Sequence, residues 1–127
     1  MTPGLPMMSM LENYLKLASS REQSISANMA NIDTPGYRTR DINFESELNK
    51  VMSEGMHPSE DGAEAVQLSP VVHEVQGLME RPDGNNVSLD HEGLMLARTQ
   101  LQYQLAIQLI QNHFHQTLSA INGGSQS

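Results

Sequence analysis

The stretch "ANMANIDTPGYR", residues 27–38, decides how the two halves of this chain are related. Asn and Asp side chains compete for backbone hydrogen bonds, so their cluster favours the end of a preceding helix. Pro35 disfavours a helical conformation for the residue before it, and Pro35-Gly36 fits the two central positions of a type II turn. The stretch therefore predicts a rigid corner, after which the chain leaves the helix axis at a fixed angle.

An amphipathic helix is expected before this corner. Apolar residues recur at steps of three and four from Met8 onward, which predicts a helix from about Met7 to about Asn31. Pro3 and Pro6 disfavour a much earlier start. The large residues of its apolar face, which we assign to assembly, are Met8, Leu11, Leu15, Ile25 and Met29.

A second amphipathic helix is expected near the C-terminus. Two apolar rows with a spacing of seven predict a helix over about Leu89 to Asn122. Ser88 is the expected N-cap, and Asp90 and Glu92 fall in the first turn, where carboxylates interact favourably with the helix dipole. Its candidate assembly face comprises Leu96, Leu101, Tyr103, Ile107, Ile110, Phe114 and Ile121.

The chain is short enough for one domain at most, and it divides into three parts. Residues 1–37 hold the first helix and the corner, residues 38–88 form a polar middle segment, and residues 89–127 hold the second helix. The predicted fold class is mainly α. Two long terminal helices form a coiled-coil hairpin around a partly disordered or short-stranded middle.

The middle segment carries weak and mixed signals. Ile42 and Phe44 alternate as in a strand, and Leu48 to Met52 suggest one helical turn. Residues 53–65 are polar and typical of a loop or of disorder. Further on, residues 66–77 contain two short extended candidates that Pro70 separates, and "RPDGNN", residues 81–86, predicts a turn.

Two helices alone leave apolar surface uncovered. The second helix is apolar over a wider arc than one partner helix covers, and exposed apolar surface of that kind marks an interaction site. The pattern therefore favours a subunit that completes its core by self-assembly or by binding partners. A small soluble helical bundle with a mobile insert remains the alternative on pattern alone.

Composition excludes several classes of function. The 127 residues carry a net charge of −8 and only seven Lys and Arg, which argues against binding to nucleic acid or to an anionic membrane. The absence of Cys excludes disulfides and thiolate chemistry. We find neither the basic and apolar regions of a secretory signal nor an apolar stretch of about 20 residues, so we expect no cleaved signal and no membrane span.

Catalytic and metal-binding patterns are also missing. His113 and His115 would lie about 200° apart on a helix, so they are poorly placed to share a metal ion. Neither His73 nor His91 begins a zinc-protease motif, and no nucleophile elbow or phosphate loop is present. We therefore predict no enzyme activity, no catalytic residue, no metal site and no cofactor.

The segment "SANMANIDTPGYRTRDINFESEL", residues 26–48, resembles the signature of the flagellar basal-body rod protein family. In that family an Asn-x-Ala-Asn-x-Asp-Thr-Pro-Gly-Tyr block ends the N-terminal helix. The matching residues are Asn28, Ala30, Asn31, Asp33, Thr34, Pro35, Gly36 and Tyr37. Residues 83–110 are also similar to this family, and both segments look most like its proximal rod subunits. The resemblance covers roughly residues 10–48 and 83–122.

The resemblance implies a structural subunit of the drive shaft that crosses the periplasm. Implied partners are other rod subunits, the protein joining the rod to the membrane ring, and the flagellar type III export gate. Export would need no cleaved signal. Phe44 and Leu48 match the Phe-x-x-x-hydrophobic motif of early export substrates, although both could simply pack on the helices. The alternative function is an export-linked adaptor that uses the same coiled-coil faces in a small closed complex.

Overall fold

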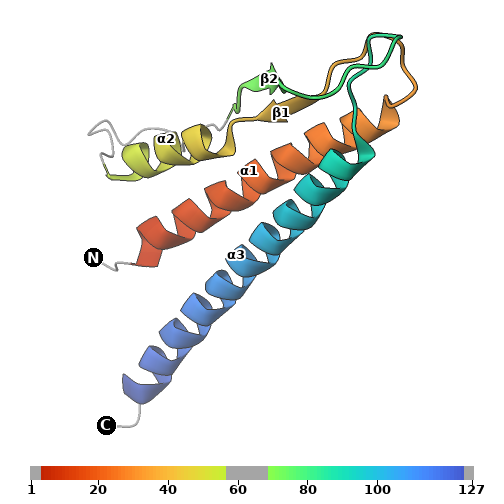
Figure 1. Cartoon of the computed structure of the whole chain (residues 1–127). Helices are drawn as coiled ribbons and strands as arrows, with labels where there is room; N and C mark the ends of the chain where they lie inside the picture. The colour runs from red at the N-terminus through yellow and green to blue at the C-terminus, as the bar shows by residue number, and fades with distance from the viewer. Residues whose placement is uncertain (1–3, 57–68, 125–127) are drawn as a thin grey trace.

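The computed structural model describes residues 4–56 and 69–124 and is mainly helical. The predicted fold class is confirmed, because two long terminal helices flank a middle segment with a short two-stranded sheet (Figure 1). Residues 57–65, which belong to the predicted loop or disorder, and residues 66–68, which begin the first extended candidate, lie outside the described ranges. The elements in chain order are α1 (Gly4–Ala30), β1 (Arg40–Ile42), α2 (Phe44–Met56), β2 (Val72–Glu74) and α3 (Leu89–Gly124).

Helices α1 and α3 form an antiparallel hairpin, and they come together at the corner that follows α1 (Figure 1). In this view α1 lies between α3 and the unit made of α2 and the two strands. Helix α1 begins at Gly4, three residues before the predicted start. Pro6 is tolerated there because the N–H groups of a first helical turn have no intrahelical acceptor.

Helix α2 is longer than the single turn that was predicted. It has 13 residues and begins at Phe44, so the predictions of an extended Phe44 and of a loop from residue 53 were wrong. Asn43 caps the helix, because its Oδ1 accepts a hydrogen bond from the Ser46 backbone N–H at 3.1 Å. Glu45 and Glu47 in the first turn add a favourable interaction with the helix dipole.

The two strands pair antiparallel, with Asp41 opposite His73 and Ile42 opposite Val72. One further backbone bond, from Val75 N–H to the Thr39 carbonyl at 2.9 Å, extends the pairing. Strand β2 is exposed along its length, whereas Ile42 of β1 is buried. The sheet therefore holds the middle segment against α1 through β1.

The hydrophobic core is small and lies where α1, β1, α2 and α3 meet. Its buried members are Leu17 and Ala18 of α1, Ile42 of β1 and Phe44 of α2. The rings of Tyr14 and Phe44 pack edge to face, with centroids 5.2 Å apart. Tyr14, Leu48 and Tyr103 cover this cluster from the outside.

Helix α3 is buried on one narrow row only, which consists of Glu92, Met95, Thr99 and Ala106. Among its described residues none beyond Ala106 is buried. The helix has 36 residues against 27 in α1, so at 1.5 Å per residue it is about 14 Å longer. The hairpin therefore covers the first half of α3 and leaves the second half largely uncovered. None of the described helices is long and apolar enough to cross a bilayer.

Candidate functional site

The corner after α1 contains the predicted turn. The Tyr37 N–H donates to the Thr34 carbonyl at 3.2 Å, and Gly36 has φ of +75°. A hydrogen bond from the fourth residue to the first, with positive φ at the third residue, is the type II pattern. The predicted type II turn with Pro35 and Gly36 at its centre is therefore confirmed.

Asn28 is the central residue of the corner and is 1% exposed. Its Oδ1 accepts hydrogen bonds from the Arg40 backbone N–H at 3.0 Å and from the Tyr37 hydroxyl at 3.1 Å. Its Nδ2 donates to the Arg40 carbonyl at 2.8 Å and to Glu92 Oε2 at 3.1 Å. One side chain thus uses its full hydrogen-bonding capacity to join α1, the corner, β1 and α3.

Asn31, the second Asn of the motif, acts locally. Its Nδ2 donates to the Ala27 carbonyl at 2.8 Å, and its Oδ1 accepts from the Thr34 hydroxyl at 3.0 Å. Both bonds are exposed to solvent. The Asn31 side chain therefore supports the end of the helix and the start of the turn through local contacts.

A second turn, residues 81–86, lies against the corner. The Gly36 N–H donates to the Asp83 carbonyl at 2.9 Å, and the Arg38 guanidinium donates to the Gly84 carbonyl at 3.2 Å. A Cβ at Gly84 would meet the Gly36 Cα at 3.3 Å, and Gly84 has φ of +87°. Glycine at position 84 is therefore needed for backbone conformation and for close approach of the two turns.

Two buried asparagines lock the turns together. Asn85 Nδ2 lies 2.9–3.0 Å from the carbonyl oxygens of Asn31, Ile32 and Thr34, which belong to the turn that follows α1. Asn86 Oδ1 accepts from the Thr39 N–H at 2.6 Å, and its carbonyl accepts from the Thr39 hydroxyl. The turn after α1 is therefore held by a residue more than 50 positions away in sequence.

Glu92 completes the joint on the α3 side. It is 1% exposed and follows Ser88, which caps α3 as predicted, since the Ser88 hydroxyl accepts from the His91 N–H at 3.3 Å. Burial raises the pKa of Glu92 above its ordinary value, and nearby Asp41 adds to the rise. The Asn28 amide and His91 oppose it. Glu92 lies in the first turn of α3, as predicted from its interaction with the helix dipole, and it is also buried against α1.

An ion pair holds β1 on α1. The Arg21 guanidinium binds the Asp41 carboxylate in a bidentate arrangement, with nitrogen–oxygen distances of 3.2 and 3.1 Å. Arg21 also lies 5.4 Å from the centroid of the Phe44 ring. Burial raises the pKa of Tyr14, an effect that the Arg21 charge opposes. The pair connects the polar corner to the small apolar core.

The predicted assembly residues take three kinds of position. Ile25 is buried inside the hairpin, and Tyr103 packs on the core cluster. Half-buried positions are held by Met8, Leu11, Leu15, Met29, Leu96 and Ile110. Exposed positions are held by Leu101, Ile107, Phe114 and Ile121. The assignment of these residues to assembly stays a prediction. Only the four exposed residues can contact another subunit without a change in the fold of the chain.

The export-motif candidates, Phe44 and Leu48, lie one turn apart on α2. Phe44 is 8% exposed and belongs to the core, and Leu48 is half-buried against it. Packing on α1 was the alternative interpretation, and the structure shows this packing. A role in export stays a prediction, and recognition of the buried Phe44 would require the chain to be unfolded.

Sequence reasoning missed four residues of the corner: Thr39, Asn85, Asn86 and Glu92, all at most 1% exposed. The available signal was the pair Asn85-Asn86, which ends the predicted turn and directly precedes the apolar Val87 and the helix cap. Asn is a frequent turn residue, so the pattern predicted a local turn. Their long-range acceptors could not be read from the local pattern.

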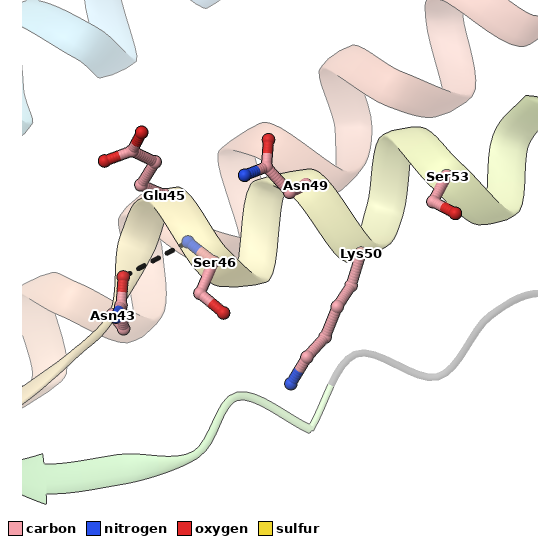
Figure 2. Close-up of a pocket in the computed structure, with 6 residues that line it drawn as sticks. All are labelled: Asn43, Glu45, Ser46, Asn49, Lys50 and Ser53. Carbon is pink, nitrogen blue, oxygen red and sulfur yellow. Dashed lines mark hydrogen bonds between the residues drawn. The ribbon is translucent and has the colours of Figure 1, made fainter.

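The described residues also form a shallow, open pocket of about 570 Å³ beside α2 (Figure 2). Its lining comprises Asn43, Glu45, Ser46, Asn49, Lys50 and Ser53. Lys50, the basic residue of this lining, lies 3.4 Å from Glu47 and points toward the segment that leads into β2. Among the described residues no group of three His, Asp or Glu could hold a metal ion. The corner, rather than this pocket, is therefore the candidate functional site.

A helical hairpin with a hydrogen-bonded corner and an uncovered apolar helix favours the class of proteins that act as subunits of larger assemblies. The chain is 34% identical to the flagellar basal body rod protein FlgB of Salmonella typhimurium, over 90% of this chain and 91% of that protein. It is 34% identical to FlgB of Escherichia coli and 30% identical to FlgB of Buchnera aphidicola, over 90% and 88% of this chain and 91% of each relative. No family model matches the sequence. The chain belongs to the FlgB family of flagellar basal body rod proteins, as the motif resemblance predicted.

Proposed function

We propose that this chain is a structural subunit of the proximal rod, the part of the flagellar drive shaft nearest the membrane ring. It leaves the cytoplasm through the flagellar type III apparatus and assembles through its terminal helices. Membership of the FlgB family supports the rod assignment. The observation that carries the mode of assembly is the uncovered apolar surface of α3.

That surface consists of two flanks on either side of the buried row. The leucine flank comprises Leu94, Leu101, Leu105 and Leu109, which are 47–68% exposed. The mixed flank comprises Ile107, Phe114, Leu118 and Ile121, which are 38–63% exposed. At 100° per residue the leucine flank lies about 115° and the mixed flank about 80° from the buried row, in opposite directions. Helix α3 can therefore contact a neighbour on each side while it keeps α1 as its partner within the chain.

Charge is distributed in a way that favours this packing. Residues 33–98 hold 13 of the 15 acidic residues and five of the seven basic residues, which accounts for the whole net charge of −8. Residues 1–32 carry balanced charges, and residues 99–127 contain no Asp, Glu, Lys or Arg. The uncharged or charge-balanced parts of the two helices can pack closely in many copies without the repulsion that an acidic surface would meet.

The corner fixes where the acidic middle segment leaves the hairpin. Asn28 holds both backbone groups of Arg40, and Arg21 holds the next residue, Asp41. Strands β1 and β2 and helix α2 thereby lie on the far side of α1 from α3 (Figure 1). In a shaft this arrangement would leave the apolar flanks of α3 open to neighbouring subunits. The contact partners on the terminal helices are other rod subunits and the junction protein of the membrane ring.

The contacts proposed for α3 use two different flanks, so they are heterologous. A heterologous contact that does not close on itself produces an open helical array, which is the geometry of a shaft. An adaptor, by contrast, would saturate its flanks in a small closed complex. The two functions therefore differ in the size of the assembly that they form.

Export before folding agrees with the position of the candidate motif. Phe44 is 8% exposed in the core, so an export gate can bind it only in the unfolded chain. The core cluster is small, and small cores give marginal stability. Unfolding for export therefore requires little free energy, and the contacts made on assembly stabilise the folded subunit afterwards.

A double variant, Leu101→Gln with Leu105→Gln, tests the mode of assembly. Both side chains are more than half exposed, so the isolated chain should keep its stability and its secretion. Light scattering with purified rod proteins should show loss of large assemblies, and complemented cells should not swim. Asn49→Gln, an exposed change on α2, is the control and should behave as the unaltered chain. Normal swimming of the double variant, or a saturating complex of fixed small size, would overturn the proposed mode of assembly and favour the adaptor.

A further inference from the structure

The outer edge of β1 is closed by side chains of the chain itself. Asn28 Nδ2 donates to the Arg40 carbonyl at 2.8 Å, and Asn28 Oδ1 accepts from the Arg40 N–H at 3.0 Å, so this amide group bonds β1 as a neighbouring strand would. Asp41 Oδ1 accepts from the Ile42 N–H at 2.7 Å. An unpaired strand edge is a template for pairing with another chain, and on this side the fold has removed it.

The outer edge of β2 is not closed in this way. The Val75 N–H donates to the Thr39 carbonyl at 2.9 Å, and the backbone groups of an antiparallel strand alternate between facing its partner and facing away. The register of the two strands then places the N–H and carbonyl groups of Val72 and Glu74 on the side away from β1. Among the described residues one contact reaches these groups, a 3.2 Å approach of His73 Nδ1 to the Glu74 carbonyl.

Strand β2 is held in an extended form at both ends. Before its first residue the Val71 N–H donates to Oε1 of the buried Glu47 on α2 at 3.3 Å, and after its last residue the Val75 N–H bonds Thr39. Strand β1 contacts both α1 and β2 and lies between them in Figure 1, so the outer edge of β2 faces away from the hairpin. A strand that is already ordered can accept a partner without the cost of ordering itself.

The side chains along this edge are exposed and do little to block pairing. Val71 is 62% exposed and Val72 is 49% exposed. Strand β2 contains neither Lys nor Pro, the residues that commonly block strand edges. Glu74 takes part in none of the ion pairs of the described residues, and residues 33–98 carry the whole net charge of −8. The edge is therefore complementary to a strand that carries positive charge.

We propose that the outer edge of β2 is a docking site for an extended, basic segment of another protein, which adds a third strand to this sheet. Backbone hydrogen bonds to Val72 and Glu74 supply the affinity of such strand addition. A basic residue opposite Glu74 and a β-branched residue opposite Val72 supply its selectivity, because directly opposed side chains interact. The site does not use the flanks of α3, so it is independent of the proposed mode of assembly.

A second copy of this chain is a poor occupant of the same edge. Each copy carries a net charge of −8, which resides in the segment that contains β2, so two copies repel each other there. Strand β2 has only three residues, and pairing of two such strands buries far less than the roughly 1,200 Å² of a stable interface. A basic segment meets attraction instead of repulsion. The small area predicts weak binding, in roughly the millimolar range, for a short segment by itself.

Titration of the full chain with a blocked peptide, Thr-Lys-Thr-Val-Thr, tests the site. In antiparallel pairing the Lys of this peptide lies opposite Glu74 when its Val lies opposite Val72. Nuclear magnetic resonance spectra should show shifts of the backbone amide signals of Val72 and Glu74 at millimolar peptide. The same peptide with N-methyl groups on its Lys and Val cannot donate the backbone bonds and should cause no shift. Absence of shifts on β2, or equal shifts with the methylated peptide, would overturn the proposal.

Two substitutions on β2 separate backbone pairing from charge. Val72→Pro removes an N–H that faces away from β1, so the pairing of the two strands is kept, and peptide binding should weaken at least about fivefold. Val72→Thr keeps this N–H and a branched side chain and is the matched control, with unchanged binding. Glu74→Lys should reverse the preference of the chain, in favour of the peptide Thr-Glu-Thr-Val-Thr. Equal binding of Val72→Pro and Val72→Thr, or an unreversed preference, would contradict strand addition.

Hydrogen exchange of the free chain distinguishes the other occupants of this edge. The amides of Val72 and Glu74 should exchange fast at every protein concentration, because they face solvent without a partner. Exchange that slows as the protein concentration rises would assign the edge to a second copy. Slow exchange in the dilute chain would show that the chain covers the edge itself. Either result would overturn the proposal.

Discussion

Replacing Asn28 by Ala tests whether the corner is a structural joint of the whole fold. The side chain makes four hydrogen bonds at 2.8–3.1 Å and is 1% exposed. At a net contribution of about 1 kcal/mol for each bond, their loss costs about 4 kcal/mol. Ala recovers at most about 0.7 kcal/mol through its higher helix propensity. The free energy of unfolding should therefore fall by roughly 3 kcal/mol, a large part of the stability of a domain of this size.

Asn31→Ala is the matched control, because Asn31 belongs to the same motif. It loses two exposed hydrogen bonds, for which about 1 kcal/mol in total is expected. Urea denaturation followed by far-ultraviolet circular dichroism measures both variants against the unaltered chain. Equal losses for Asn28→Ala and Asn31→Ala, within about 0.5 kcal/mol, would refute the argument that Asn28 joins the two helices.

The remaining predictions concern the turn, the ion pair and the flanks. Gly36→Ala, at φ of +75°, should lower the free energy of unfolding by about 1 kcal/mol, whereas Gly93→Ala, exposed within α3, should raise it by a similar amount in the same urea assay. Arg21→Met should lower the free energy of unfolding by about 3 kcal/mol, because the largely buried carboxylate of Asp41 loses its partner. An unchanged melting temperature of Arg21→Met in calorimetry would contradict this prediction. Leu101→Gln should change the free energy of unfolding of the isolated chain by less than about 0.5 kcal/mol, because Leu101 is 68% exposed.

The structure also shows how a chain with little apolar material obtains a defined corner. The core cluster has four fully or nearly buried apolar residues, whereas Asn28, Asn85 and Asn86 are each at most 1% exposed. Buried amides are costly unless they are satisfied, and these three find partners on other segments. Because each partner must be placed accurately, the network specifies one geometry for the corner more strictly than apolar packing would.

Local features of the corner could be predicted from the sequence. Pro35 and Gly36 restrict their own backbone angles, so the type II turn followed from residue types alone. The Ser88 cap and the existence of both long helices followed from residue spacing in the same way. Helix α2 was predicted only as one turn, because Ile42 and Phe44 alternate as in a strand while Asn43 caps a helix. Periodicity over so few residues does not decide between a strand and a helix.

Tertiary structure alone decided which of these features meet. Asn85 holds the turn after α1 from more than 50 residues away, and Glu92 reaches Asn28 from 64 residues away. Periodicity also marked Ile25 and Phe114 as members of similar apolar faces, yet Ile25 is buried and Phe114 is 59% exposed. Residue spacing determines which side of a helix is apolar, but which part of that side is covered depends on where the partner helix lies. That position is set here by long-range hydrogen bonds between buried amides, which leave no periodic signal in the sequence.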